Sequence, residues 1–267
     1  MVRYLVILLS GVAILCNYSR AADPLVRQQK TVIVDGVAEV WQLRWEKKPK
    51  PFCGADDAEL SLTCPCSGFA YGEQGKLTLV RERPGGLHET LSLGPFFADA
   101  DLPGIAAGAS LVQRWQPVEA GDENDWKHAS DKDFVNQVRK RKLKNLMILA
   151  DYDHDGRATE FLLQVATKPC GKHQMVLVGI SKLNPHLHAF ATPEKPHSPL
   201  LLASWEWEAL LKSEHTSIID WQCGDHDSGY EWRAILDAHD GVLHAKFQSF
   251  ECQAEGSAVK LIEEVDR

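Results

Sequence analysis

Basic residues are fewer than acidic residues in this chain of 267 residues. Lys and Arg together number 29, against 37 Asp and Glu, so the formal net charge is −8. Proteins that bind nucleic acids or anionic lipid surfaces do so through concentrated basic residues. The charge balance therefore argues against a nucleic-acid partner.

A hydrophobic run long enough to span a bilayer is also missing. The longest run covers residues 5–16, whereas a membrane-spanning helix needs about 20 residues. It follows Arg3 and precedes Ser19-Arg20-Ala21, whose small residues suit cleavage after Ala21. We expect residues 1–21 to be a signal peptide, no transmembrane segment in the mature chain, and a secreted or periplasmic location. A short buried helix or a membrane anchor is the alternative.

Sequence motifs of several enzyme classes are absent. The chain has no G-x-S-x-G elbow for a serine nucleophile and no P-loop or G-x-G-x-x-G for nucleotide phosphates. The segment His88-Glu89-Thr90-Leu91-Ser92 begins like a zinc-protease helix, but Ser92 replaces the second histidine ligand. These absences favour a non-enzymatic protein over an enzyme.

The composition is that of a globular protein, with 44% hydrophobic and 25% charged residues. Short β-branched segments flank Asp35-Gly36, a strong hairpin signal. Residues 76–83 and 87–93 indicate two further strands, and residues 204–212 indicate a short helix, as does the segment after Ser130. We expect a mainly β (β-rich α+β) fold of antiparallel sheets with about two short helices. Residues 22–267 would form a single compact domain, with a possible division near 116–130.

The mature chain would hold an even number of cysteines. In an exported protein, an even number predicts a disulfide framework, and six cysteines allow up to three bonds in 15 connectivities. The sequence does not choose among these connectivities. A zinc site and a redox-active Cys-Pro-Cys segment are the alternatives. The candidates are Cys53, Cys64, Cys66, Cys170, Cys223 and Cys252.

The sharpest chemical signal is the segment Asp151-Tyr152-Asp153-His154-Asp155-Gly156. Three carboxylates at alternate positions converge on one point in a short loop, and glycine lets the chain turn sharply. Calcium takes about six to eight oxygen ligands, so carbonyls and water must complete its shell. An acidic turn held by Asx-type hydrogen bonds, without metal, is the alternative. The candidate ligands are Asp151, Asp153 and Asp155, the carbonyl of Arg157, and, as second choices, Thr159 and Glu160.

This segment resembles the calcium loops of the EF-hand, dockerin and FG-GAP/VCBS (integrin-type) families. It departs from the EF-hand at loop position 12, where Leu162 replaces glutamate, and Glu160 falls two positions earlier. An FG-GAP loop joins two strands and has an acid at position 9, which here is Thr159. The apolar run 160–165 favours this β-loop-β form, with 146–150 as the preceding strand. A helix is the alternative for that preceding segment, because Leu143, Leu146, Met147 and Ala150 also have helical spacing. The whole chain is also similar to a loose group of uncharacterised exported bacterial proteins, which implies an exported setting and no particular activity.

Two function classes follow from these signals. The first is an exported, non-enzymatic calcium-binding domain with a protein or carbohydrate partner, since an exposed pair among the eight tryptophans would stack on sugar rings. The second is a secreted or periplasmic hydrolase with a polar active site. Its candidate residues are Asp225, His226 and His173, because a carboxylate beside an imidazole suits a general base.

Overall fold

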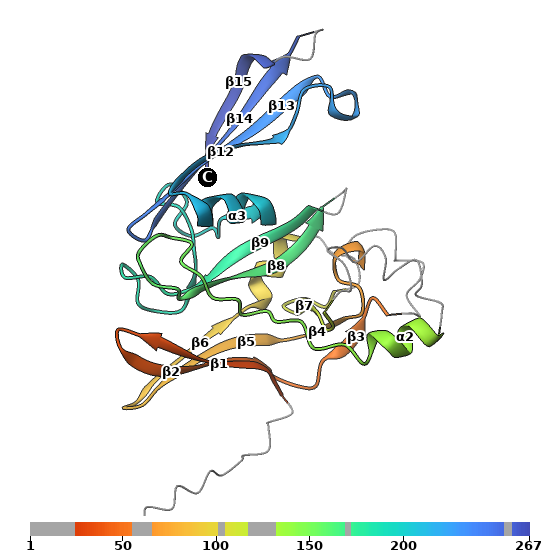
Figure 1. Ribbon diagram of the computed structural model, residues 1–267, viewed down its shortest axis with the longest axis vertical. Coiled ribbons are helices and arrows are strands. Elements are labelled where there is room, and N and C mark those ends of the chain that lie inside the picture. The colour runs from red at the N-terminus through yellow and green to blue at the C-terminus, as the bar shows by residue number, and fades with distance from the viewer. Residues whose placement is uncertain (1–24, 55–65, 101–104, 117–131, 169–171, 254–257) are drawn as a thin grey trace, which may run out of the picture.

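Antiparallel sheets dominate the computed structural model, which describes residues 25–54, 66–100, 105–116, 132–168, 172–253 and 258–267 (Figure 1). One sheet orders β1 (Val26–Val34), β2 (Val37–Trp45), β5 (Leu77–Arg83) and β6 (Leu87–Ser92). A smaller one orders β3 (Lys50–Phe52), β4 (Gly72–Gly75) and β7 (Ser110–Gln113). The prediction of a mainly β, antiparallel fold is confirmed.

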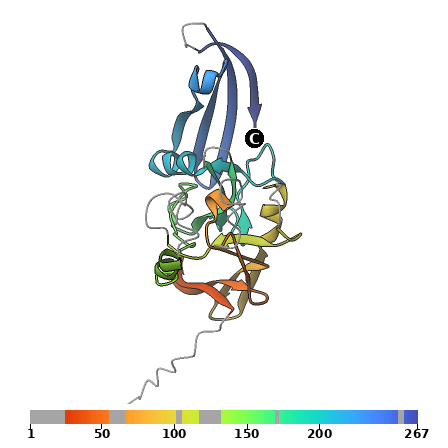
Figure 2. The ribbon, with the colours of Figure 1, turned by 90° about the vertical axis from the view of Figure 1, so that its right-hand side faces the viewer.

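Two further sheets complete the described part of the chain. In the central sheet, β9 (Lys172–Gly179) pairs with β8 (Glu160–Lys168), β10 (His188–Ala189) and β11 (Leu201–Ala203). The C-terminal sheet orders β12 (His215–Trp221), β13 (Tyr230–His239), β14 (Val242–Cys252) and β15 (Ala258–Asp266). Figures 1 and 2 place the C-terminal sheet at one end of an elongated molecule, the β1–β2–β5–β6 sheet at the other, and the central sheet between them.

Two α-helices lie within the described residues, as the sequence predicts. They are α2 (Lys132–Val138) and α3 (Ser204–Lys212), and the bounds of α3 match the prediction. Ser130, the predicted start of the first helix, lies outside the described residues. The Glu206 side chain accepts a hydrogen bond from the Ala203 N–H at 2.6 Å and so caps the first turn of α3.

The central sheet is buried on both faces. Phe161, Leu163 and Val178 belong to a large core cluster shared with the β1–β2–β5–β6 sheet. Leu177 points the other way, into a second cluster with Trp207 of α3 and the C-terminal sheet. Strands buried on both faces have near-continuous apolar sequences, which explains the run 160–165. The central sheet therefore joins the two clusters.

The β-loop-β prediction around the acidic segment is wrong in its first half. Residues 144–149 form no strand, and the residues on either side of them form isolated bridges, Leu143 with Trp115 and Ala150 with Glu160. The Gln28 side chain accepts hydrogen bonds from the backbone N–H groups of 146 and 147, at 2.7 and 3.2 Å. A side-chain amide therefore satisfies backbone groups that a neighbouring strand would otherwise bind.

Two disulfides link the described cysteines, Cys53 to Cys66 and Cys223 to Cys252. The second disulfide links the segment between β12 and β13 to the last residue of β14. Cys64 and Cys170 lie outside the described residues, as do the predicted signal peptide and the segment 117–131. A third disulfide, the signal peptide and a division near 116–130 therefore stay predictions.

Candidate metal centre

The acidic segment leads directly into β8, whose first residue is Glu160. One carboxylate oxygen from each of Asp151, Asp153 and Glu160 lies within 4.8 Å of the other two. Asp153 and Glu160 are fully buried, and Asp151 is half-buried. These three side chains form a candidate metal centre, which we call the acidic triad.

Backbone N–H groups hold Asp151 in place. Its two carboxylate oxygens accept hydrogen bonds from the N–H of Asp155 and the N–H of Gly156, each at 3.0 Å. Gly156 has a φ of +86°, a conformation that glycine adopts without a Cβ penalty. The loop therefore wraps around the Asp151 carboxylate, as the Asx-type alternative predicts. These bonds leave further lone pairs on both oxygens.

Asp155 is placed differently from the other predicted acids. One of its oxygens accepts the N–H of Arg157 at 2.8 Å, and the other accepts the N–H of Lys182 at 2.5 Å. Its carboxylate is not part of the acidic triad. Asp155 thus ties the loop to the segment that follows β9. Sequence spacing could not reveal this, because Lys182 lies 27 residues further along the chain.

The remaining predicted ligands have other contacts. The Arg157 guanidinium pairs with Asp35 in the β1–β2 turn at 2.7 Å. The Thr159 hydroxyl lies 2.7 Å from Glu160 Oε1 and 2.9 Å from the Ile180 carbonyl oxygen. Glu160, a second choice in the sequence, is therefore the acid that completes the triad, and Thr159 orients it.

Asp153 carries the most unusual atom of the centre. Its Oδ1 accepts the N–H of Asp155 at 3.2 Å. Its Oδ2 is buried and has no hydrogen-bond partner among the described residues. A buried oxygen without a partner costs roughly 1–3 kcal/mol, and more when it is charged. Burial, reinforced by the neighbouring Asp155 carboxylate, raises the pKa of Asp153 to about 7.

Both carboxylate oxygens of Glu160 accept hydrogen bonds, and the residue is as deeply buried as Asp153. Its Oε2 accepts the N–H of Tyr152 at 2.9 Å, and its Oε1 accepts the N–H of Thr159 at 3.2 Å. Burial, followed by the nearby Asp153 carboxylate, raises its pKa to about 9. Without a cation the charged forms of both acids are therefore disfavoured, whereas a bound cation would favour them.

The loop is fixed by contacts from the C-terminal part of the chain. The Gly241 N–H in the β13–β14 turn donates to the Asp153 carbonyl at 3.0 Å. The His154 Nε2 lies 2.7 Å from the Leu210 carbonyl oxygen of α3. The Tyr152 ring meets Trp207 of α3 edge-on, with 6.1 Å between ring centroids. The acidic triad therefore lies where the central sheet, α3 and the C-terminal sheet meet.

Of the candidate hydrolase residues, Asp225 and His226 lie in contact, and His173 lies on β9. His226 Nδ1 lies 2.9 Å from Asp225 Oδ1, but both side chains are exposed. His173 lines a pocket to which neither Asp225 nor His226 contributes. Within the described chain, neither imidazole forms a hydrogen bond to a serine, threonine or cysteine.

No helix among the described residues is long and apolar enough to cross a membrane. Comparison with known proteins found no matching protein family, no matching curated protein and no matching solved structure.

Proposed function

We propose that this protein is an exported, non-enzymatic domain whose fold is stabilised by a divalent cation held by Asp151, Asp153 and Glu160. The observation that carries the proposal is the buried, unpartnered Oδ2 of Asp153 beside two further carboxylates. A cation placed there would supply the missing partner for this oxygen. It would also balance carboxylates that otherwise repel one another.

Calcium is the ion we favour. The donors are all oxygens, which suits a hard cation and disfavours zinc or copper. Asp151 is half-buried, so water has access to complete a shell of about six to eight ligands. Magnesium demands a stricter octahedral arrangement and retains more of its water.

The export part of the proposal rests on the disulfides. The Cys53–Cys66 and Cys223–Cys252 bonds are typical of oxidising compartments such as the periplasm or the extracellular space. In such a compartment millimolar calcium would fill even a site with a Kd of about 10⁻⁴ M. N-terminal sequencing of the mature protein tests export, and a retained Met1 would contradict it.

Titration calorimetry on the full, metal-free mature chain tests the cation site. We expect one calcium ion per chain, weaker binding of magnesium, and much weaker calcium binding by the Asp153→Asn variant. The matched control is Asp225→Asn, which removes an exposed acid of another loop and should bind calcium like the wild type. Equal calcium binding by the wild type and Asp153→Asn would overturn the proposal.

A further inference from the structure

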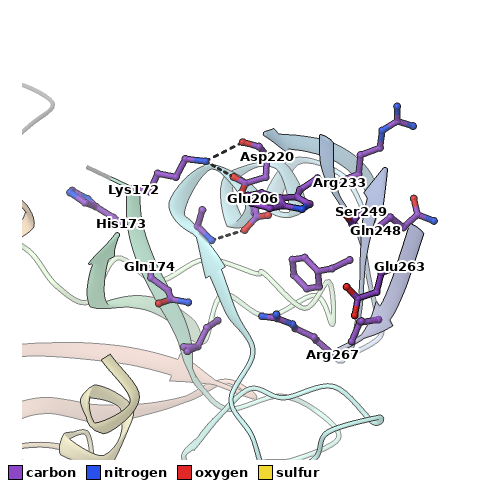
Figure 3. Close-up of a pocket in the computed structure, with 15 residues that line it drawn as sticks. Lys172, His173, Gln174, Glu206, Asp220, Arg233, Gln248, Ser249, Glu263 and Arg267 are labelled. Atoms are coloured by element: carbon purple, nitrogen blue, oxygen red, sulfur yellow. Dashed lines mark hydrogen bonds and ion pairs between the residues drawn. The ribbon is translucent and has the colours of Figure 1, made fainter. Parts of the chain in front are cut away.

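A pocket of about 320 Å³ lies between the central sheet and the C-terminal sheet (Figure 3). Its volume is at the lower end of the range of small-molecule sites, about 300–1,000 Å³. Lys172 and Gln174 of β9 form one wall, and residues of β13, β14 and β15 form the other. The acidic triad does not contribute to it. The pocket is therefore a second candidate site, separate from the metal centre.

Trp232 is a large, half-exposed aromatic residue that lines the pocket. It lies on the same face of β13 as Ala234 and Leu236, because side chains alternate along a strand. Both of those residues are fully buried, whereas Trp232 is 48% exposed where it lines the pocket. A large aromatic ring left open at a concave site is typical of a surface that a ligand covers.

Contacts among the side chains next to Trp232 hold this part of the pocket in place. The Trp221 ring packs against Trp232 with 6.2 Å between centroids. The Lys172 ammonium lies 4.9 Å from the centre of the Trp221 ring and 5.1 Å from that of Trp205. It also donates to Asp220 Oδ1 at 3.0 Å. A wall held by such contacts loses little conformational freedom when a ligand binds.

Charge inside the pocket is nearly balanced. Lys172 and Arg267 are its cations and Glu206, Asp220 and Glu263 its acids, whereas Arg233 lies on the opposite face of β13 from Trp232. Lys172 is paired with Asp220, and Arg233 Nε pairs with Glu231 at 2.6 Å. An anionic ligand would approach three carboxylates and a cationic one would approach two cations, so the electrostatics favour a neutral ligand.

The polar groups that line the pocket suit a hydroxyl-rich ligand. Carboxylates accept hydrogen bonds, guanidinium and ammonium groups donate them, and the amide of Gln174 does both. Figure 3 shows the Glu263 and Arg267 side chains directed toward the pocket, whereas the His173, Arg233 and Gln248 side chains point away from it. A sugar ring presents hydroxyl groups at its edge and apolar C–H groups on its faces, and such a face suits an indole. We propose that this pocket binds a neutral saccharide, with Trp232 as its stacking platform.

The test is a titration of the full mature chain with neutral tetrasaccharides of glucose, mannose and N-acetylglucosamine, followed by tryptophan fluorescence and calorimetry. We expect saturable binding of at least one of them. Trp232→Ala should weaken it by at least about tenfold, which is about 1.4 kcal/mol, and Trp232→Phe, which keeps a ring, should retain most of the affinity. Binding is expected in both calcium and chelator, so a failure of the metal proposal would not affect this result.

The matched control is Tyr230→Ala. Tyr230 lies on the same strand and face, is 50% exposed, and does not line the pocket. It should bind the saccharide like the wild type. The proposal is overturned if no neutral tetrasaccharide binds, if Trp232→Ala binds as tightly as Tyr230→Ala, or if only an acidic oligosaccharide such as oligogalacturonate binds.

Discussion

The Gly241 N–H donates a hydrogen bond to the Asp153 carbonyl oxygen at 3.0 Å, so the tip of the β13–β14 hairpin closes directly on the acidic loop. A Cβ added to Gly241 would lie 3.5 Å from the unpartnered Oδ2 of Asp153. The loop also contacts α3 through His154. A cation at the acidic triad would therefore stabilise the junction between the central sheet and the C-terminal sheet, and its effect should extend to the whole fold.

The Asp153→Asn variant should lose most of its thermal response to calcium. A cation that binds only the folded state adds about 2.7 kcal/mol at one hundred times its Kd, or roughly 5–10 °C in Tm for a chain of this size. In chelator the variant should be as stable as the wild type or more so, because a neutral amide relieves carboxylate repulsion. Differential scanning calorimetry in calcium and in chelator measures both effects. A variant that keeps the full calcium response would contradict this prediction.

Gly241→Ala should weaken calcium binding as well as lower stability. Gly241 has a φ of +86°, so alanine costs about 1–2 kcal/mol of backbone strain, and the turn that closes on Asp153 shifts. Gly36→Ala is the control, because Gly36 occupies a similar Asp-Gly turn with a φ of +77° and open space around it. Urea unfolding should show a similar loss for the two variants, but calcium titration should show weaker binding only for Gly241→Ala. Equal affinities would contradict the proposed coupling.

Glu39→Gln should be among the most destabilising single substitutions outside the metal centre. Glu39 is fully buried and forms a bidentate pair with the Arg81 guanidinium, at 2.6 and 2.9 Å. Breaking a buried pair from one side costs about 3–5 kcal/mol. The control is Glu46→Gln, whose exposed partner Lys76 lies 3.6 Å away, and which should cost less than about 1 kcal/mol. A loss below about 1 kcal/mol for Glu39→Gln in urea unfolding would contradict the prediction.

The Glu39–Arg81 pair should also make the stability of the fold depend on pH. Burial alone would raise the pKa of Glu39, but hydrogen bonds from Arg81, Trp41 and Arg83 outweigh it and hold the pKa below its ordinary value. The stabilisation is therefore present above the unfolded pKa of about 4.3 and is lost as pH falls through the folded pKa. Wild-type stability should fall more steeply below about pH 4 than that of Glu39→Gln. Parallel acid-unfolding curves would refute this.

Removing the Cys223–Cys252 bond by a double serine substitution should destabilise the fold by about 3–4 kcal/mol, because the bond closes a separation of 29 residues. The calcium response should persist, since neither cysteine contacts the acidic triad. Urea unfolding with and without calcium measures both quantities. Unchanged stability, or a lost calcium response, would count against this part of the account.

The sequence predicts the local features of the fold well. The Asp35-Gly36 hairpin, the helix at 204–212 and the acidic loop all follow from short-range patterns, and the structure places each of them where it was expected. The absence of a strand at 146–150 could not be predicted in this way. It depends on the Gln28 side chain, which is distant in sequence and satisfies the backbone there.

The candidate metal ligands also show what residue spacing cannot predict. Alternation of acids predicted Asp151, Asp153 and Asp155 as one group of ligands; the structure groups the carboxylates of Asp151 and Asp153 with Glu160, and the Asp155 carboxylate accepts the Lys182 N–H. Glu160 takes its place because β8 begins there and directs the side chain back to the Tyr152 N–H. Pairings between distant segments, like the choice among disulfide partners, depend on tertiary packing that residue spacing does not encode.

The central claim is that a cation is bound by Asp151, Asp153 and Glu160. A crystal structure of the mature chain grown with calcium, with an anomalous difference map, tests it most directly. The account predicts one peak about 2.3–2.6 Å from an oxygen of each of these three carboxylates, with Asp153 Oδ2 among them. A map without a peak at the acidic triad, at calcium concentrations of several millimolar, would contradict it.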